Sequence, residues 1–124
     1  GDGAEGLGGP RAPGSPEHSA MALAMRYVQA HISEEISVEQ LARLCSYSPS
    51  TFHAKFKQAT GIPPVEFMVR EKIGEAKLLL ESSGRSITSI AMELGFNSSQ
   101  HFSVLFKKYV GESPVQYRRH NAVP

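Results

Sequence analysis

The chain repeats one short phrase, and this repeat limits the folds open to it more than any other feature does. Residues 44–57 read LCSYSPSTFHAKFK and residues 94–107 read LGFNSSQHFSVLFK. In both copies a polar stretch precedes two phenylalanines that stand one helical turn apart. The chain is therefore predicted to contain two copies of one helical unit.

The match extends beyond the phrase, with one inserted residue. The paired positions are Ser37, Val38, Leu41, Ala42 and Cys45 with Ser86, Ile87, Ile90, Ala91 and Leu94 at an offset of 49, and Phe52, Phe56, Lys57, Gly61, Pro64, Val65 and Phe67 with Phe102, Phe106, Lys107, Gly111, Pro114, Val115 and Tyr117 at an offset of 50. The inserted residue falls in the turn between two predicted helices, where a change of length is tolerated better than inside packed helices. Its position supports the predicted helix boundaries.

Serine residues mark the starts of the paired helices. Ser37 offers an N-cap oxygen with Gln40 three residues later, the pattern of a capping box, and Ser48 precedes Pro49, which suits the first helical position. Gly61 suits the left-handed residue that ends a helix. The second copy carries these signals at Ser86, at Asn97 or Ser98, at Gly111 and at Ser113–Pro114. Each copy is predicted to hold a short helix, a tight turn and a second helix.

Two longer helices are predicted to precede these pairs. An amphipathic pattern begins at Ser19, and Pro63–Pro64 introduce the longest helix, which ends near Ser82. The residues expected to be buried are Ala20, Leu23, Ala24, Tyr27, Val28 and Ile32 in the first, Val65, Val69, Ile73, Ala76 and Leu80 in the second, and Val115 and Tyr117 in the final short helix.

The predicted fold class is all-α, with about seven helices forming two helix-turn-helix subdomains joined by a long central helix. The expected boundaries are residues 17–63, 64–83 and 84–121. Residues 1–16 contain six glycines and three prolines, so this stretch is expected to be a flexible tail or linker. A connector to a missing domain and a remnant of expression are both open interpretations.

Composition and charge placement narrow the class of protein. No apolar stretch approaches the roughly 18 residues of a membrane span, and the start lacks the order of a secretion signal, so a soluble cytoplasmic protein with no membrane partner is expected. The net charge is only +1. However, residues 40–65 and 94–111 contain lysines and no acidic residue. Because carboxylates repel phosphate, these windows favour a polyanionic partner.

The second helix of each unit is predicted to bury few residues and to leave a polar face outside. Such a helix fits the major groove of DNA, which is roughly 12 Å wide. The candidate contact residues are Ser50, Thr51, His53, Ala54 and Lys57 in the first unit and Ser99, Gln100, Ser103, Val104 and Lys107 in the second. Hydroxyl and amide groups can bond to base edges, and lysines suit phosphates.

The connecting helix gives this prediction a length test. About twenty residues at roughly 1.5 Å each span about 30 Å, close to the roughly 34 Å between successive major-groove faces. One chain is therefore expected to occupy two adjacent major grooves of double-stranded DNA.

The residues resemble the AraC/XylS family of transcriptional regulators over roughly residues 20–119. The resemblance is carried by ITSIAMELGFNSSQHFSVLFKKYVGESPVQYRR, in which the family's recurrent positions are Ile90-Ala91, Gly95-Phe96, Phe102, Phe106-Lys107, Gly111, Ser113-Pro114 and Tyr117-Arg118. It implies a seven-helix domain with two helix-turn-helix motifs that activates bacterial promoters through RNA polymerase. Many family members also carry an effector-binding or dimerisation domain, which here would precede the tail.

Three positions depart from the family pattern. Ala54 and Val104 stand where the family frequently has a long polar residue such as arginine, and apolar contact with a thymine methyl is a substitute for guanine readout there. Lys72 stands where the family often has arginine, which keeps the charge without bidentate geometry.

Two other classes of function are compatible with a small helical chain. A helical protein–protein interaction module is the alternative to DNA binding. A hydrolase or transferase would need a nucleophile with a base, a metal cluster or a phosphate loop, and none is found, so no catalytic residue, metal or cofactor is expected. His53 is open to a DNA contact or a structural role, whereas His101 is expected to be structural or to contact phosphate. Cys45 is interpreted as a small core residue rather than a redox switch, and Lys108 and Arg119 as ordinary solvated charges.

Overall fold

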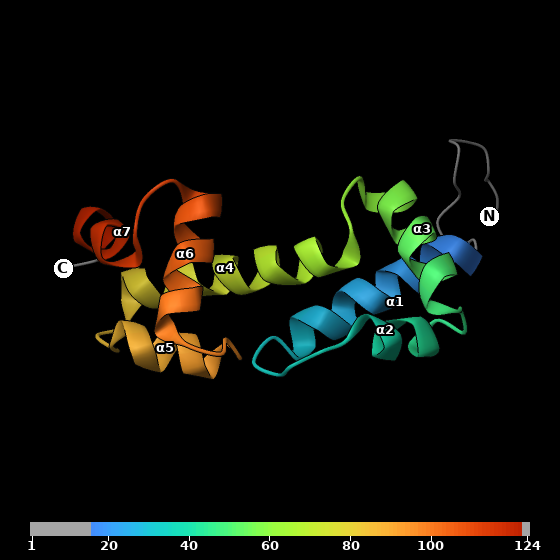
Figure 1. Ribbon diagram of the computed structural model, residues 1–124, viewed down its shortest axis with the longest axis horizontal. Coiled ribbons are helices and arrows are strands. Elements are labelled where there is room, and N and C mark those ends of the chain that lie inside the picture. The colour runs from blue at the N-terminus through green and yellow to red at the C-terminus, as the bar shows by residue number, and fades with distance from the viewer. Residues whose placement is uncertain (1–15, 123–124) are drawn as a thin grey trace. The chain divides into compact units, whose positions relative to one another are not determined.

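The computed structural model describes residues 16–122, and within them it contains seven helices and no strand (Figure 1). The helices are α1 (Pro16–Ala30), α2 (Val38–Leu44), α3 (Pro49–Thr60), α4 (Pro64–Ser82), α5 (Ile87–Glu93), α6 (Ser99–Val110) and α7 (Pro114–Asn121). The all-α class is confirmed. Residues 1–15 of the expected tail lie outside the described residues, and α1 begins at Pro16, three residues before the expected start at Ser19.

Contacts divide the described chain into two units. The first comprises residues 16–30 and 36–67, and the second comprises residues 31–35 and 68–122. The boundary therefore falls inside α4. Residues 31–35 lie between α1 and α2 in the sequence, yet they pack with the second unit.

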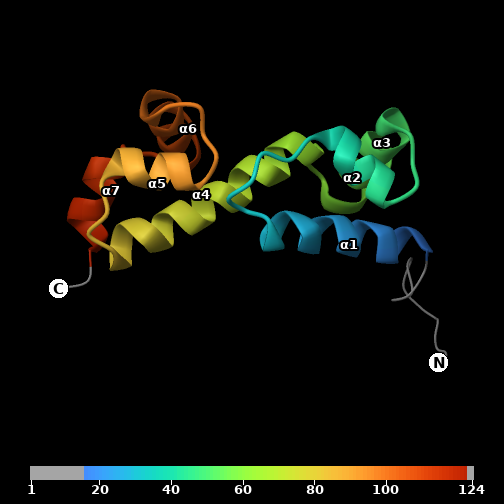
Figure 2. The same cartoon turned by 90° about the horizontal axis from the view of Figure 1, so that it is seen from below.

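The first unit is a group of three helices, with α2 and α3 packed on α1 (Figure 2). Its buried apolar residues are Met21, Ala24 and Val28 from α1, Leu41 and Ala42 from α2, and Phe52 and Phe56 from α3. The Phe56 ring centroid lies 5.6 Å from that of Phe52 and 5.4 Å from that of Phe67. Tilted and edge-on ring pairs at such distances add stability beyond the burial of apolar area.

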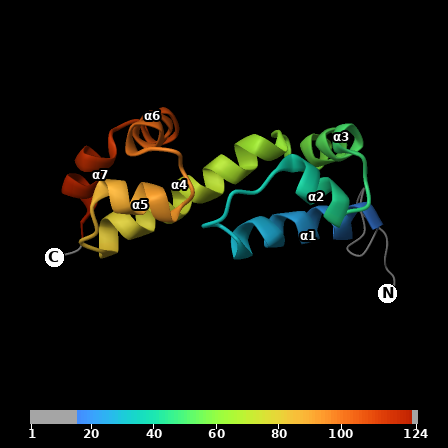
Figure 3. The ribbon, with the colours of Figure 1, turned by 60° about the horizontal axis from the view of Figure 1, so that its bottom comes forward.

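The second unit gathers α5, α6 and α7 around the C-terminal part of α4, as Figures 1 and 3 show. Its core consists of Ile73, Ala76, Leu80, Ile90, Ala91, Leu94, Phe96, Phe102, Phe106 and Tyr117. Four of these residues form a continuous row of rings, in which successive centroids are 5.1, 5.7 and 5.5 Å apart. The row runs from Phe96 through Phe102 and Phe106 to Tyr117, so it ties α6 to both the preceding turn and the last helix.

The structural repeat is longer than the sequence repeat. The buried residues of α1 at positions 21, 24 and 28 have the same spacing as those of α4 at positions 73, 76 and 80. The later part of α4 therefore serves α5 and α6 as α1 serves α2 and α3. Each unit therefore contains three equivalent helices, and the start of α4 in the first unit corresponds to α7 in the second.

Three expected core positions are wrong. Leu23 keeps 39% of its surface exposed, and Met21 takes its place in the core. Val65 and Val115 are 55% and 51% exposed, because the prolines that precede them at the first helical position are the residues that turn inward. A side chain one position further along a helix points about 100° away from its neighbour.

Candidate nucleic-acid interface

Helix α3 is held by a cap at each end. The Ser48 hydroxyl oxygen accepts a hydrogen bond from the Thr51 backbone N–H at 3.3 Å, and Pro49 follows it at the start of the helix. Gly61 ends the helix with φ of 86°, and its N–H donates to the Lys57 carbonyl at 2.7 Å. Since α3 buries Phe52 and Phe56 on one side, its other side is left outside.

All five predicted contact residues of α3 are exposed: Ser50, Thr51, His53, Ala54 and Lys57. Four of them follow at the spacing of one helical face. The Thr51 hydroxyl oxygen already accepts a hydrogen bond from the Ser48 hydroxyl at 2.9 Å. Thr51 therefore contacts a ligand mainly by donating its own hydroxyl proton. The face thus presents hydroxyl, imidazole, methyl and ammonium groups, with no carboxylate.

Helix α6 follows the same plan. Ser98, one of the two predicted candidates, is the N-cap, and its hydroxyl oxygen accepts from the His101 backbone N–H at 3.0 Å. Gly111 ends the helix with φ of 100°. Phe102 and Phe106 are completely buried, so α6 is also anchored along one side only.

The predicted contact residues of α6 differ in exposure. Gln100 and Lys107 are exposed, and Val104 keeps 64% of its surface, whereas Ser99 and Ser103 are half-buried. A large ligand that approaches α6 therefore meets first the amide of Gln100, the isopropyl group of Val104 and the ammonium of Lys107. An apolar side chain as exposed as Val104 contributes little to the core of the unit.

His53 and His101 belong to no cluster of metal-ligating side chains within the described residues. His53 and His101 are both exposed, and the His101 ring lies 6.1 Å from the Phe96 ring. Between residues 16 and 122, no three side chains of histidine, cysteine, aspartate or glutamate come together in a way that could hold a metal ion. In the same range, no helix has the length and apolar character needed to cross a membrane.

Cys45 is half-buried beside α1. Its thiol donates to the Ala20 carbonyl across an Sγ–O distance of 3.2 Å, and burial raises the pKa of the thiol. A raised pKa opposes the thiolate form that a redox switch requires.

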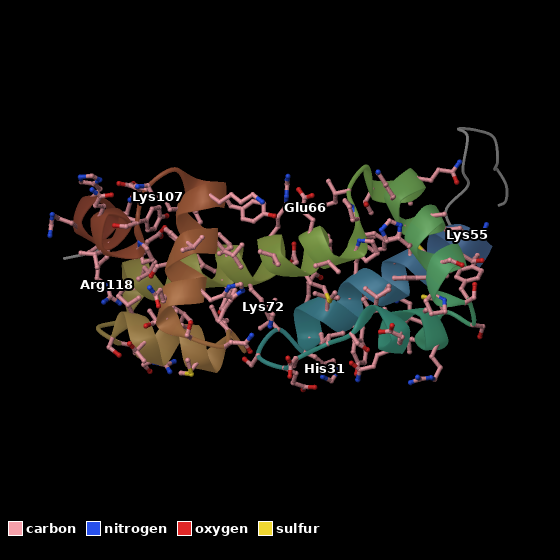
Figure 4. The ribbon with its side chains drawn as sticks, viewed as in Figure 1. His31, Lys55, Glu66, Lys72, Lys107 and Arg118 are labelled. Atoms are coloured by element: carbon pink, nitrogen blue, oxygen red, sulfur yellow. The ribbon has the colours of Figure 1, made fainter. Side chains whose placement is uncertain are left out.

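Lys72 is the principal residue whose role the sequence did not reveal. Its ammonium donates to three backbone carbonyls of the second unit, those of Ile32 at 2.6 Å, Glu34 at 3.0 Å and Leu94 at 2.6 Å (Figure 4). Burial lowers the pKa of Lys72, and the Glu35 carboxylate acts against that shift. Lys72 therefore positions the end of α5 and the start of the turn that leads to α6.

Gly95, in that turn, makes the close approach possible. It has φ of 82°, and a Cβ atom there would lie 3.3 Å from Lys72 Nζ and 3.4 Å from the Ser33 carbonyl oxygen. A larger residue would push against both groups. The only sequence signal of this arrangement was a lysine beside the buried positions of α4, and its partners up to 40 residues away could not be named from local pattern.

The chain is similar in sequence to a known protein family and to several transcriptional activators. A family model described as a helix-turn-helix domain matches residues 41–120. The HTH-type transcriptional activator RhaS from Enterobacter sp. (strain 638) is 37% identical over 95 residues, which cover 77% of this chain and 34% of RhaS. The chain thus spans about a third of the length of the curated relatives it matches.

Solved structures share the fold. A transcriptional regulator with an AraC-type DNA-binding domain from Chromobacterium violaceum superposes with a TM-score of 0.79 at 26% identity, covering 86% of this chain and 95% of that one. The DNA-binding domain of AdpA, a global transcriptional factor solved in complex with a target DNA, superposes with a TM-score of 0.78 at 30% identity, covering 82% and 91%.

Proposed function

Since the chain belongs to the AraC/XylS family of transcription regulators and contains its helix-turn-helix DNA-binding domain, we propose that α3 and α6 are the helices that enter DNA. The observation that carries this proposal is the composition of their outer faces. Each face is anchored by a buried phenylalanine pair behind it, carries a lysine one turn before the helix end, and has no carboxylate. Such a face can approach phosphates without repulsion.

The residues of each face have separate roles in this proposal. Lys57 and Lys107 contact the DNA backbone, where a cation binds phosphate regardless of sequence. The base-contacting residues are Ser50, His53, Ser99, Gln100 and Ser103, with Thr51 beside them. Ala54 and Val104 offer methyl groups, which suit the methyl group of thymine. The exposure of Gln100 and Val104 supports a larger share for these two than for the half-buried serines of α6.

The length of α4 supports engagement of two adjacent major grooves. Its 19 residues at roughly 1.5 Å each give a helix of about 28 Å, against roughly 34 Å for one turn of duplex. In this proposal one chain reads two successive grooves, one with each unit.

The intact regulator is proposed to act as an activator in the bacterial cytoplasm. The name of the relative RhaS as a transcriptional activator supports this direction of regulation. RNA polymerase is the partner that such a role requires. A separate effector-binding or dimerisation domain fits the observation that the matched region covers only 34% of the relative RhaS.

A binding titration against mixed duplex DNA at several salt concentrations tests the function. We expect the logarithm of the association constant to fall linearly with the logarithm of salt concentration, because cations on the protein release counterions from the phosphates. Absent or salt-insensitive binding would favour the alternative, a helical protein–protein interaction module.

Selection of bound sequences from a random duplex pool tests the base-reading residues. Gln100→Ala is expected to relax the preference at one base position, with a loss of about 1–3 kcal/mol of discrimination. Gln58→Ala is the matched control, because Gln58 is also an exposed glutamine near a lysine but lies outside the assigned set. An unchanged base preference in the Gln100 variant would show that this side chain does not read a base.

A further inference from the structure

A groove of about 420 Å³ opens between α4 and the C-terminal end of α6, inside the second unit. Three cationic residues line it, Arg70 and Lys77 from α4 and Lys108 from α6, together with Tyr109. No acidic residue is among the lining residues. The groove therefore concentrates positive charge at one place on the unit.

A single ring brings two of these charges together. The Arg70 guanidinium lies 5.6 Å from the centroid of the Tyr109 ring, and the Lys108 ammonium lies 5.5 Å from the same centroid. Lys77 lies 5.9 Å from the Tyr117 ring. A ring face attracts each cation, but the cations repel one another, and an anion bound between them would relieve that repulsion.

Gly74 keeps the groove open. It lies in the interior of α4, where glycine is less favourable than alanine, and it lines the groove between the cations. A Cβ atom there would meet nothing within 4 Å, and Gly74 does not adopt a left-handed φ. Neither internal packing nor a turn requires this glycine, and the lack of a bulky side chain leaves room for a ligand between the cations.

The position of Lys108 on α6 indicates which anion fits. Lys108 follows Val104 by four residues, so it lies on the same side of the helix and about 6 Å further along its axis. If the N-terminal half of α6 faces base edges in a groove roughly 12 Å wide, its C-terminal end meets the sugar–phosphate wall of that groove. A phosphodiester of DNA is then the anion nearest to the cations.

We propose that the groove formed by Arg70, Lys77 and Lys108 over Gly74 and Tyr109 holds a DNA phosphate next to the bases that α6 reads. This site rests on the proposed function and adds to it a backbone contact that involves α4. It belongs to the second unit alone, because the residues of α3 equivalent to Lys108 and Tyr109 are Gln58 and Ala59.

Charge removal tests the site. In the double variant Arg70→Gln, Lys108→Gln, we expect severalfold weaker binding to DNA and a salt-dependence slope reduced by about 1, the contribution of one phosphate contact. The selected base sequence should stay the same, because phosphate contacts carry no base information. The control is Arg26→Gln, Arg119→Gln, which removes the same charge from two exposed residues outside the groove. If both double variants change the slope equally, the effect is net charge and the site is refuted.

Filling the groove tests the site without any change of charge. Gly74→Leu should weaken DNA binding severalfold while leaving the midpoint of thermal unfolding at or above that of the parent protein, because leucine is a better helix former than glycine. Gly74→Ala should bind nearly as the parent does. Normal DNA affinity in the leucine variant overturns the proposal, and so does normal DNA affinity in the variant Arg70→Gln, Lys108→Gln. If the parent protein shows no salt-dependent DNA binding at all, the failure lies with the proposed function instead.

Discussion

The turn between the paired helices takes a left-handed residue in both units, but that residue is Ser46 in the first and Gly95 in the second. Ser46 has φ of 63° and is exposed, whereas Gly95 has φ of 82° and lies against Lys72 and the Ser33 carbonyl. A residue with a Cβ atom tolerates this backbone at a cost, but it cannot also tolerate a close neighbour. The difference shows that packing around the second turn, and not the turn itself, requires the glycine.

The contact between the first two helices of each unit, α1 with α2 and α4 with α5, also differs between the units. In the first unit the Cys45 thiol donates to the Ala20 carbonyl, and in the second unit Lys72 donates to the Leu94 carbonyl. Cys45 and Leu94 are equivalent in the repeat, and Ala20 and Lys72 are equivalent by the spacing of the buried residues of α1 and α4. One location therefore holds a weak thiol bond in one unit and a charge-assisted bond in the other.

The largest expected effects come from the buried phenylalanines. Phe56→Ala and Phe106→Ala each remove a completely buried ring and should each lower the free energy of unfolding by about 3–5 kcal/mol. Urea unfolding gives the total effect, and native-state amide exchange shows in which unit protection is lost. Equal loss of protection across both units in both variants would break the comparison, because it would mean that the two units unfold as one.

The turn residues should respond in opposite directions. Gly95→Ala is expected to destabilise the protein by about 2 kcal/mol, since it combines left-handed strain with a crowded Cβ. Ser46→Gly is expected to raise stability by up to about 1 kcal/mol, because glycine removes the strain of the left-handed backbone. The gain is limited because glycine also adds conformational entropy to the unfolded chain. Thermal unfolding of both variants checks the pair. A Gly95→Ala protein as stable as its parent would contradict the role assigned to the neighbouring lysine and carbonyl.

Loss of the Lys72 ammonium should cost about 2 kcal/mol, because three carbonyls lose a charged donor. Lys72→Met keeps most of the apolar stem and removes the charged donor. Cys45→Ala, at the equivalent contact in the first unit, should cost less, because a thiol is a weak donor. Chemical unfolding of the two variants in parallel ranks the contacts, and a larger loss for Cys45→Ala would reverse the assignment.

The smallest effect depends on pH. Tyr117 donates to the Glu81 carboxylate, and burial first, then this hydrogen bond and the charges of Glu81 and Glu112, raise the pKa of Tyr117 from 10.0 to about 12. The folded state therefore holds the phenolic proton to higher pH than the unfolded chain does. The stability that this bond provides is complete below pH 10 and is lost as pH rises toward 12.

Tyr117→Phe should lower stability at neutral pH by about 1 kcal/mol and flatten the alkaline loss relative to the parent protein. Unfolding midpoints across the alkaline range give the difference between the two proteins. The first unit supplies its own reference, because its equivalent residue is Phe67. An unchanged alkaline slope in the variant would assign the loss to another group.

Local signals made much of this fold predictable. Ser37, Ser48, Ser86 and Ser113 cap helices as the sequence indicated, and Gly61 and Gly111 adopt the left-handed conformation that ends them. These features depend on a few neighbouring residues, so a sequence can reveal them. The outward side of α3 followed from its phenylalanine pair for the same reason.

The remaining features depend on partners that are distant in the chain. The sequence indicates for Lys72 only a charge in place of arginine, because nothing near it in the sequence marks the carbonyls that it contacts. The sequence predicts an ordinary solvated lysine at position 108, yet Lys108 lines a groove with residues of α4. The inward turn of Pro64 and Pro114, which left Val65 and Val115 outside, reflects tertiary packing that overrides a helical pattern.

Residues 31–35 have a practical consequence for anyone who divides the molecule. This short segment lies between two helices of the first unit in the sequence, but its carbonyls accept hydrogen bonds from Lys72 of the second unit. No single cut of the polypeptide can yield both halves whole. A fragment that starts within α4 would lack residues 31–35, which pack with the second unit. A fragment that ends in α4 before Lys72 would contain the Ile32 and Glu34 carbonyls without the ammonium that donates to them.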